Sequence, residues 1–266
     1  MRVRLVFLSA LAFSAGCHSV VNYGDAAGPR YAGQRAAAPP APEQLKVVSF
    51  NVKFAVHVDR AIDLLRGNDS LRGADILLLQ EMDARGVEQV ADALDLSYVY
   101  YPATVSPNTG RDFGNAILSR FPILDDRKIV LPHRARIGGT ERAAVGATIL
   151  IGTRRVRVYS VHLATMVGNG PHDRRDQLRA VLADADSSSP VIIGGDFNSE
   201  TVPDLARQHG YLWPTRQLPH TNNFWTFDHF LLKGVGLADP ASFGVVHDVR
   251  GASDHKPVWA LIRLAA

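Results

Sequence analysis

Two short motifs in the last third of the chain contain residue types that could carry out hydrolytic chemistry. Gly194-Gly195-Asp196-Phe197-Asn198 follows the apolar run Val191–Ile193, which predicts a buried strand that ends in a glycine-containing turn. Asp196 and Asn198 are two residues apart, so in extended backbone their side chains point to the same side. Ser253-Asp254-His255-Lys256-Pro257 places a carboxylate beside an imidazole just before another predicted strand. Together the motifs indicate a hard divalent metal ion acting on a phosphate ester.

Four further polar residues stand at the ends of other predicted strands: Asn51, Glu81, His162 and Asp228. Taken singly, each has a simpler interpretation, because an Asn or Asp at a strand end is usually a turn residue, Glu81 could be a solvated acid and His162 a core histidine. Eight such coincidences in one chain are not expected by chance. If these ends meet at one rim, they supply four carboxylates, two amides and two imidazoles. That oxygen-rich set suits Mg²⁺ or Mn²⁺ better than zinc.

The elements that must position these residues alternate between strands and helices. Short apolar runs predict strands, and apolar spacing of three and four residues predicts helices. Gly152-Thr153 joins two of the strands and predicts a hairpin. Hairpins mixed with strand–helix units favour sheets covered by helices, although the pattern alone leaves the layering open. The predicted strands cover residues 45–51, 75–79, 98–101, 115–118, 143–151, 155–162, 191–193, 227–232 and 257–262, and the predicted helices cover 58–71, 84–94 and 173–185.

Length and charge fit one globular domain and give little support to nucleic-acid binding. The chain has 266 residues, 46% of them hydrophobic, which is enough for a substantial core. Of 29 basic and 26 acidic residues, four and two lie before residue 44, which leaves 25 and 24 in the rest of the chain. A nearly neutral domain lacks the broad positive field that duplex binding uses.

The N-terminus has the layout of a bacterial export signal. A short basic start precedes the apolar run Leu5–Phe13, which is too short to span a membrane, and small residues follow. Cys17, the only cysteine, comes directly after Ala15-Gly16, as at a lipoprotein cleavage site; the alternative is an ordinary cleaved signal with an incidental cysteine. We therefore expect a signal peptide over residues 1–17 with Cys17 lipidated, a tether rich in Ala, Pro and Gly over 18–43, and a domain over 44–266.

Eight segments of the chain, taken in order, carry a family resemblance. They are Ser49–Val52, Leu79–Met82, Gly114–Arg120, Glu141–Ala143, Ser160–Leu163, Gly194–Asn198, Phe227–Phe230 and Ser253–Val258. In this order they resemble the endonuclease/exonuclease/phosphatase superfamily, which includes DNase I, exonuclease III, inositol polyphosphate 5-phosphatases and neutral sphingomyelinases. The resemblance spans nearly the whole domain, and the ordered set is specific although each piece alone is weak.

This resemblance implies a fold, a metal and a reaction. The fold would be a four-layer α/β/β/α sandwich of two mixed β-sheets flanked by helices. The reaction would be metal-dependent hydrolysis of a phosphoester by a monomer, with Mg²⁺ (or Mn²⁺) held by Glu81, Asn51 and Asp254. Arg142 would clamp a phosphate oxygen. Whether one or two metal ions bind stays open.

The resemblance also implies catalytic roles. His255 would be the general base for the attacking water, oriented by Asp228. Asp196 and Asn198 would position the nucleophile and the phosphate. His162 would hydrogen-bond the phosphate or assist the leaving group.

His162 bears on the branch of the family, because abasic-site endonucleases typically lack a histidine at this position. The export signal also argues against a repair enzyme. Three functions remain: an exported hydrolase of small or lipid phosphoesters, an exported DNase I-like endonuclease, and a non-catalytic binding module. The near-neutral charge favours the first over the second, and the complete set of site residues argues against the third. We expect the protein itself to be exported, either to the cell envelope with a lipid anchor or to the periplasm or the medium.

Overall fold

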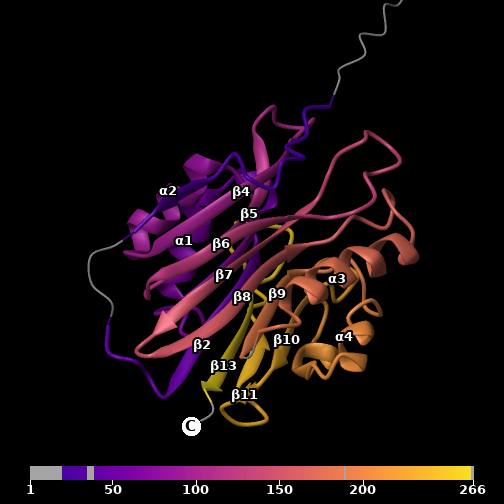
Figure 1. The fold of residues 1–266 in the computed structure, drawn as a ribbon. Coiled ribbons are helices and arrows are strands. Elements are labelled where there is room, and N and C mark those ends of the chain that lie inside the picture. The colour runs from indigo at the N-terminus through magenta and orange to yellow at the C-terminus, as the bar shows by residue number, and fades with distance from the viewer. Residues whose placement is uncertain (1–19, 35–38, 189, 265–266) are drawn as a thin grey trace, which may run out of the picture.

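The computed structural model describes residues 20–34, 39–188 and 190–264, which form two β-sheets with helices outside them (Figure 1). The strands of the larger sheet are β1 (Tyr31–Gly33), β2 (Gln44–Asn51), β3 (Ile76–Met82), β4 (Ser97–Val105), β5 (Asp112–Ser119), β11 (Val235–Leu237), β12 (Phe243–Val245) and β13 (Val258–Leu264). Those of the smaller sheet are β6 (Ile123–Val130), β7 (Ala143–Ile151), β8 (Arg154–His162), β9 (Val191–Asp196) and β10 (Asp228–Lys233).

Both sheets are mixed, and each contains one parallel pair. The larger sheet has the order β1-β4-β5-β3-β2-β13-β11, with β12 also paired to β13, and the smaller has the order β10-β9-β8-β7-β6. The parallel pairs are β2 with β3 and β8 with β9. A helix connects the strands of each pair, α1 (Val58–Gly67) in the first and α3 (Pro171–Ala185) in the second. The carboxyl ends of β2 and β3 therefore lie side by side in the larger sheet, and those of β8 and β9 lie side by side in the smaller.

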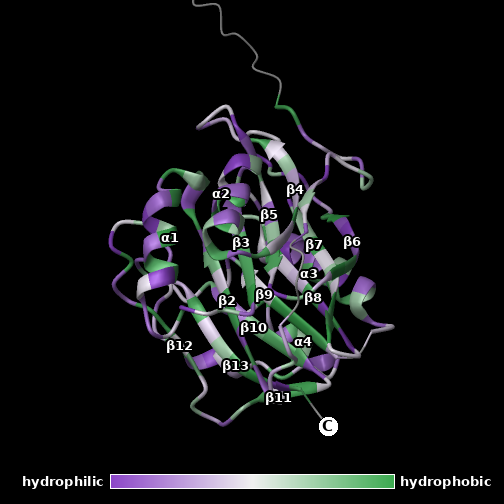
Figure 2. Cartoon of the chain, turned by 90° about the vertical axis from the view of Figure 1, so that its left-hand side faces the viewer, coloured by the Kyte–Doolittle hydropathy of each residue, from purple (hydrophilic) through white to green (hydrophobic). Residues whose placement is uncertain are grey.

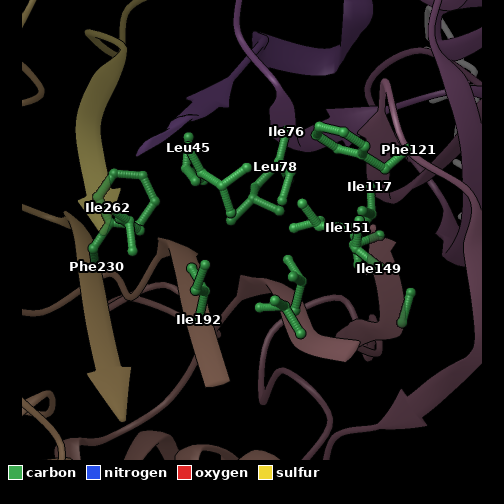
Figure 3. Packing of buried hydrophobic residues seen from close by; sticks show 14 of the residues in the cluster. Leu45, Ile76, Leu78, Ile117, Phe121, Ile149, Ile151, Ile192, Phe230 and Ile262 are labelled. Atoms are coloured by element: carbon green, nitrogen blue, oxygen red, sulfur yellow. The ribbon is translucent and has the colours of Figure 1, made fainter. Parts of the chain in front are cut away.

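The main core lies between the two sheets. Alternate residues of each strand point into it, as Leu45 and Val47 of β2 do from the larger sheet and Ile192 of β9 does from the smaller. Figure 3 shows Leu45, Ile76 and Leu78 of the larger sheet in one cluster with Ile192 and Phe230 of the smaller sheet. Because the inner faces of the two sheets pack against each other, inward-pointing side chains at the strand ends of both sheets lie at the same end of the core.

Helices cover the two outer faces. Val58, Leu64 and Leu65 of α1 and Val87 and Val90 of α2 (Ala84–Leu94) pack on the larger sheet. Leu178, Val181 and Leu182 of α3 pack on the smaller, together with residues of α4 (Asp204–Gln208). In Figure 2 the strands are largely green, and the purple of hydrophilic residues is concentrated on the helices and loops. The predicted four-layer sandwich with two mixed sheets is confirmed.

The prediction from periodicity missed four strands, namely β1, β6, β11 and β12. β6 contains Asp125-Asp126-Arg127-Lys128 and is an edge strand of the smaller sheet, paired only with β7. An edge strand can carry charged residues, so no apolar run marks it. β1, β11 and β12 have three residues each, too few to show a period. The helix predicted over 58–71 ends at Gly67, because Asn68 leaves the helical conformation and its Oδ1 accepts a hydrogen bond from the backbone N of Ser70.

The predicted tether is wrong for much of its length. β1 pairs with β4, and Asn22 forms a β-bridge with Thr104. Lys128 Nζ donates to the carbonyl oxygens of Tyr23 and Gly28 at 2.7 and 2.6 Å. The Ala, Pro and Gly content gave no apolar period, but backbone pairing with an existing strand does not require one. The predicted signal peptide, with Cys17, lies outside the described residues. Among the described residues, no helix is long and apolar enough to cross a membrane.

Candidate active site

The site lies where the parallel pairs end. Asn51 is the last residue of β2 and pairs with Gln80 of β3, while His162 ends β8 and pairs with Asp196, the last residue of β9. Asp228 begins β10, which runs antiparallel to β9, and it also pairs with Asp196. Strand register therefore brings polar residues from both sheets to one rim.

Strand alternation turns these side chains inward. Val47, Ser49 and Asn51 share a face of β2, just as Ile192, Gly194 and Asp196 share a face of β9, and the apolar members of both sets belong to the core between the sheets. The same period directs His162 and Asp228 into this space. The polar set is the continuation of the core face at its open end.

Glu81 reaches the site through an irregularity in β3. The register of β3 against β5 shifts between Leu79 and Met82, and Glu81 has a φ of 59°. Regular alternation after Leu79, which faces the helices, would turn Glu81 to that side as well. An extra residue in the strand re-aims the side chain, as β-bulges often do beside active sites.

Two adjacent glycines allow close approaches of β9 next to the site, one to its neighbour β8 and one to the opposite sheet. Gly195 has a φ of +149°, and a Cβ there would lie 1.9 Å from the carbonyl oxygen of Val161. A Cβ on Gly194 would lie 2.6 Å from Leu78 Cδ1 of the opposite sheet. Gly194 is thus required by packing between the sheets and Gly195 by the backbone of β8, directly before Asp196.

Asn51 links the acidic groups of the two sheets. Its Nδ2 donates to Glu81 Oε1 and to Asp196 Oδ2, at 3.1 Å each. Its Oδ1 accepts from the backbone N of Lys53 at 3.0 Å, and the backbone N of Phe54 donates to Glu81 Oε2 at 3.0 Å. The amide and the turn after β2 therefore hold both carboxylates in place.

That turn is strained. Lys53, Phe54 and Ala55 have φ values of 40°, 55° and 49°, a run of three non-glycine residues in the left-handed region. Each such residue costs about 1 kcal/mol or more. Arg111 Nη2 donates to the carbonyl oxygen of Phe54 at 2.8 Å and, with the bonds to Asn51 and Glu81, holds this conformation. Strain of this kind persists only where surrounding contacts enforce it, as they do beside this site.

A carboxylate–imidazole pair occupies the opposite side of the site. His255 Nδ1 lies 2.9 Å from Asp228 Oδ2, and His255 Nε2 lies 3.7 Å from Asp196 Oδ2. Ser253 positions this histidine, since its Oγ accepts from the backbone N of His255 at 3.1 Å and donates to the carbonyl oxygen of Asn51 at 2.7 Å. The imidazole is thus fixed through Nδ1 and presents Nε2 to the site.

Burial and neighbouring charges shift the pKa values of Asp196 and His255. Burial raises the pKa of Asp196 to about 7, and the charges of Asp228 and Glu81 add to the effect against that of His255. Burial lowers the pKa of His255, but the charges of Asp228 and Asp196 outweigh it and raise the pKa to about 10. The site therefore concentrates negative charge in a place with little solvent.

His162 and Arg142 form the remaining wall. Arg142 Nη1 lies 3.0 Å from Nδ1 and 3.2 Å from Nε2 of His162, and its guanidinium stacks on the ring of Phe113 at 4.9 Å. Burial, with the positive charges of Arg142 and His255, holds the pKa of His162 well below its usual value. His162 is therefore a neutral imidazole, 3.5 Å from Asp196 Oδ2.

The donor set fits a divalent cation. Ligand atoms of Asp196, Asp228 and His255 lie within 4.8 Å of one another. Asp228 Oδ1 is buried and has no hydrogen-bond partner in the part of the chain that the structure describes. An orphaned, buried carboxylate oxygen close to a second buried acid indicates excess negative charge that a nearby cation would offset, and oxygen donors suit Mg²⁺ or Mn²⁺.

Seven of the nine residues predicted for catalysis, phosphate and metal come together here. They are Asn51, Glu81, Arg142, His162, Asp196, Asp228 and His255. Asn198 is beside them, but its Nδ2 donates to the carbonyl oxygen of Leu163 at 3.0 Å, and its backbone N donates to Asp196 Oδ1 at 2.8 Å. In this structure it positions Asp196 and shows no side-chain contact with the other site residues.

Asp254 lies apart from the buried acids. Its carboxylate is 44% exposed and forms an ion pair with Lys53 Nζ at 2.9 Å. Among the described residues it has no hydrogen bond or ion pair with Glu81 or Asn51. Two adjacent residues in an irregular segment point in different directions, and here His255 takes the inward one. The grouping of Asp254 with Glu81 and Asn51 as metal ligands therefore has no geometric support in this structure.

Three residues that support the site had no assigned role in the sequence. Ser253 and Phe113 act through the contacts above, and Thr221 Oγ1 accepts from the backbone N of Phe227 and of Asp228 at 2.9 and 3.1 Å. Ser253 stands inside a recognised motif, so its hydroxyl was a detectable signal. Thr221 and Phe113 reach the site only through folding, and no local pattern marks them.

The chain matches one family model and shares its fold with several solved structures. The family model described as Endonuclease/Exonuclease/phosphatase family matches residues 48–255. Among solved structures, a humanized D. rerio TDP2 has 18% identity and a TM-score of 0.65 over 84% of this chain and 100% of that one. Sphingomyelinase C from Streptomyces griseocarneus has 19% identity and a TM-score of 0.61, over 83% and 99%.

The human Nocturnin catalytic domain with a bound sulfate anion has 17% identity and a TM-score of 0.61, over 89% of this chain and 97% of that one. At these identities the structures establish a shared fold. A search of curated proteins gave no match. The family model covers well over half of the chain, and its range includes every residue brought together at the rim. The chain therefore belongs to the endonuclease/exonuclease/phosphatase family, whose members are phosphoester-hydrolysing enzymes that generally depend on a divalent metal ion.

Proposed function

We propose that this protein is a Mg²⁺- or Mn²⁺-dependent phosphoester hydrolase that uses His255 to activate water. The observation that carries the proposal is the buried Asp228–His255 pair, 2.9 Å apart, whose Nε2 lies 3.7 Å from Asp196, the carboxylate that Asn51 links to Glu81. An oriented imidazole next to a cluster of oxygen ligands is the arrangement that hydrolysis of a phosphoester by water requires.

The side chains divide the reaction between them. His255 Nε2 accepts a proton from the attacking water as the water oxygen bonds to phosphorus, and Asp228 stabilises the imidazolium that forms. The bond from phosphorus to the leaving oxygen breaks, that oxygen takes a proton from a second water molecule, and the imidazolium gives its proton to the hydroxide that remains. Arg142 and neutral His162 donate hydrogen bonds to the phosphoryl oxygens, whose charge grows in the transition state.

Glu81, Asn51 and Asp196 would hold the metal ion, which when bound polarises a phosphoryl oxygen. Its charge would also oppose the carboxylates that raise the pKa of His255. Because a general base must be unprotonated, ion binding and proton acceptance by His255 are coupled in this arrangement.

Turnover assays test the proposal. The purified protein with Mg²⁺ or Mn²⁺ is incubated with bis-p-nitrophenyl phosphate, sphingomyelin, inositol phosphates and plasmid DNA. His255→Ala should lower kcat by about 10²- to 10⁴-fold with the fold intact, whereas the exposed His172→Ala should leave it unchanged. If none of these substrates is turned over in a metal-dependent way, the hydrolase function is refuted and the binding module is favoured. Cleavage of plasmid DNA alone would favour the endonuclease.

We further propose that the protein is exported and carried on the cell envelope by a lipid on Cys17. The supporting features are the basic and apolar start of the chain and the Ala15-Gly16-Cys17 sequence. Mass spectrometry of the mature N-terminus tests this. An unmodified chain that begins after Cys17 would contradict the anchor.

A further inference from the structure

Exposed apolar side chains gather on the loops around the site. Nine large hydrophobic residues are exposed in the described part of the chain. Only Tyr31 and Leu212 lie elsewhere, in β1 and beside Leu232 near the far end of β10. The other seven, which we call the apolar rim, are Val21, Val56, Ile137, Met166, Val167, Phe224 and Trp225.

Topology places all seven at the end of the domain that holds the site. Val56 follows the turn after β2, and Met166 and Val167 follow β8. Phe224 and Trp225 precede β10, whose first residue is Asp228. Each segment is the direct continuation of a strand that contributes a site residue.

Val21 and Ile137 complete the rim on the side of Arg142. The carbonyl oxygen of Val21 accepts from the backbone N of Val105 at the end of β4. Ile137, together with Phe54, Phe113, Glu81 and Arg142, lines a cavity of about 300 Å³. The rim and the site are therefore continuous through a partly apolar cavity.

The exposure of the rim is large for a surface exposed to water only. Val167 is 82% exposed, and Ile137 and Phe224 are 73% exposed each. Scattered exposed apolar residues are ordinary, but a set concentrated at one end of a domain marks an interaction surface. An apolar surface is what this end of the domain offers a partner.

Four basic side chains near the rim are each paired with a carboxylate. Lys53 pairs with Asp254, Arg111 with Asp83, Arg134 with Glu141 and Arg136 with Asp173. Nucleic acid would need basic side chains free to neutralise phosphates. Here the apolar side chains lie among ion pairs whose charges cancel. Such a surface instead suits a partner that has an apolar interior beneath a polar outer layer.

The N-terminal segment enters the domain at this same end. Asn22 Nδ2 donates to the carbonyl oxygen of Gly139, and its Oδ1 accepts from the backbone N of Glu141, at 2.9 Å each. In Figure 1 the chain reaches the domain beside the loop that follows β4. Cys17 is five residues before Asn22, which limits their separation to about 18 Å in extended chain. A lipid on Cys17 would hold the rim against a membrane.

We propose that the apolar rim docks on a lipid bilayer and presents the site to phosphoesters of membrane amphiphiles. The substrate class rests on the proposed hydrolase function, but the docking itself does not. The headgroup phosphate would meet Arg142 and the metal ligands, and the rim side chains would enter the boundary between headgroups and acyl chains.

Trp225 provides a direct test. The chain has three tryptophans, of which Trp213 is 8% exposed and Trp225 is 44% exposed. The full chain carrying Cys17→Ser, which has no lipid of its own, is mixed with phosphatidylcholine vesicles in buffer with Mg²⁺. We expect the emission of Trp225 to shift to shorter wavelength and to be quenched by brominated phosphatidylcholine.

Matched variants with the same N-terminus separate the rim from other contacts. Val167→Ser combined with Phe224→Ser should weaken vesicle binding by at least about tenfold. Leu212→Ser removes an apolar side chain that is 58% exposed but lies away from the rim, and this variant should bind as the parent does. An unchanged Trp225 spectrum, or equal loss in the Leu212 variant, would overturn the inference.

Two further outcomes would assign the rim to another partner and also overturn docking. One is a Trp225 response to single-stranded oligonucleotide without a response to vesicles. The other is a rim-dependent dimer in sedimentation velocity without lipid. Turnover of bis-p-nitrophenyl phosphate is measured on the same sample. Turnover without docking would refute only this inference, and docking without turnover would refute only the hydrolase function.

Discussion

Replacing Asp196 by Asn should change how stability depends on pH in the absence of metal. Asp196 is 1% exposed, and its pKa is raised to about 7 by burial and by the charges of Asp228 and Glu81. In the unfolded chain the pKa of an aspartate is about 3.9. The folded protein therefore binds a proton that the unfolded chain releases between about pH 4 and pH 7. Stability from this group is fully present below pH 4 and is lost as the pH rises to 7.

The size of this effect follows from the shift. Three pKa units at 1.36 kcal/mol each give on the order of 4 kcal/mol as the largest loss. Asp196→Asn is neutral throughout, so this contribution vanishes. The variant also loses a hydrogen bond to Asn51 or to the backbone N of Asn198. That loss is the same at both pH values and cancels in the comparison.

Urea unfolding in EDTA at pH 4.5 and pH 7.5 measures the difference. The parent protein should lose up to about 4 kcal/mol more than Asp196→Asn between these pH values. Asp254→Asn, which changes an exposed carboxylate, should keep the parent behaviour. If the free energy of unfolding changes equally with pH in the parent and in Asp196→Asn, within about 1 kcal/mol, the raised pKa assigned to the buried Asp196 is refuted.

Three other changes test separate parts of the structure. In metal-free protein, saturating Mg²⁺ at about 100 times its Kd should stabilise the fold by about 2.7 kcal/mol, and Glu81→Gln should abolish most of this gain in a thermal melt. Gly195→Ala places a Cβ 1.9 Å from the carbonyl oxygen of Val161, so we expect little soluble folded protein by circular dichroism; native-like yield and Tm would contradict the packing argument. Arg30→Met breaks the ion pair with Asp126. Burial raises the pKa of Asp126, but the hydrogen bonds from Arg30 and Tyr101 outweigh burial, so the pKa is lowered. Because a lowered carboxyl pKa stabilises the fold only above about pH 4, hydrogen exchange in residues 20–34 should become faster in this variant at pH 7, and little changed at pH 3.

The fold could be predicted from the sequence where local pattern and burial agree. The apolar runs at 45–51, 75–79 and 191–193 each correspond to a central strand, because a strand covered on both faces needs continuous apolar residues. Edge strands such as β6 and β1 escaped, since an edge needs fewer apolar side chains and β1 is held mainly by its backbone. The same reason explains why residues 20–34 looked like a tether.

For the site, the sequence indicated which residue types could act but not which way each one points. Alternation placed Asn51, His162 and Asp196 on the core face, a consequence of period two that any extended strand obeys. Glu81 depends on a bulge with positive φ, and Asn198 turns its amide to Leu163. Such local departures depend on the neighbouring strand and cannot be read from spacing.

The sequence by itself determined which oxygen-rich side chains stand at the ends of apolar strands, because that is a property of the order of residues along the chain. Only the tertiary structure decided the partners. It selected His255 over Asp254 for the interior, since a buried imidazole can bond to Asp228 whereas Asp254 finds Lys53 at the surface. It also brought the N-terminal segment and seven exposed apolar residues to the mouth of the site. Contacts between segments up to two hundred residues apart depend on how the sheets pack, which no local pattern encodes.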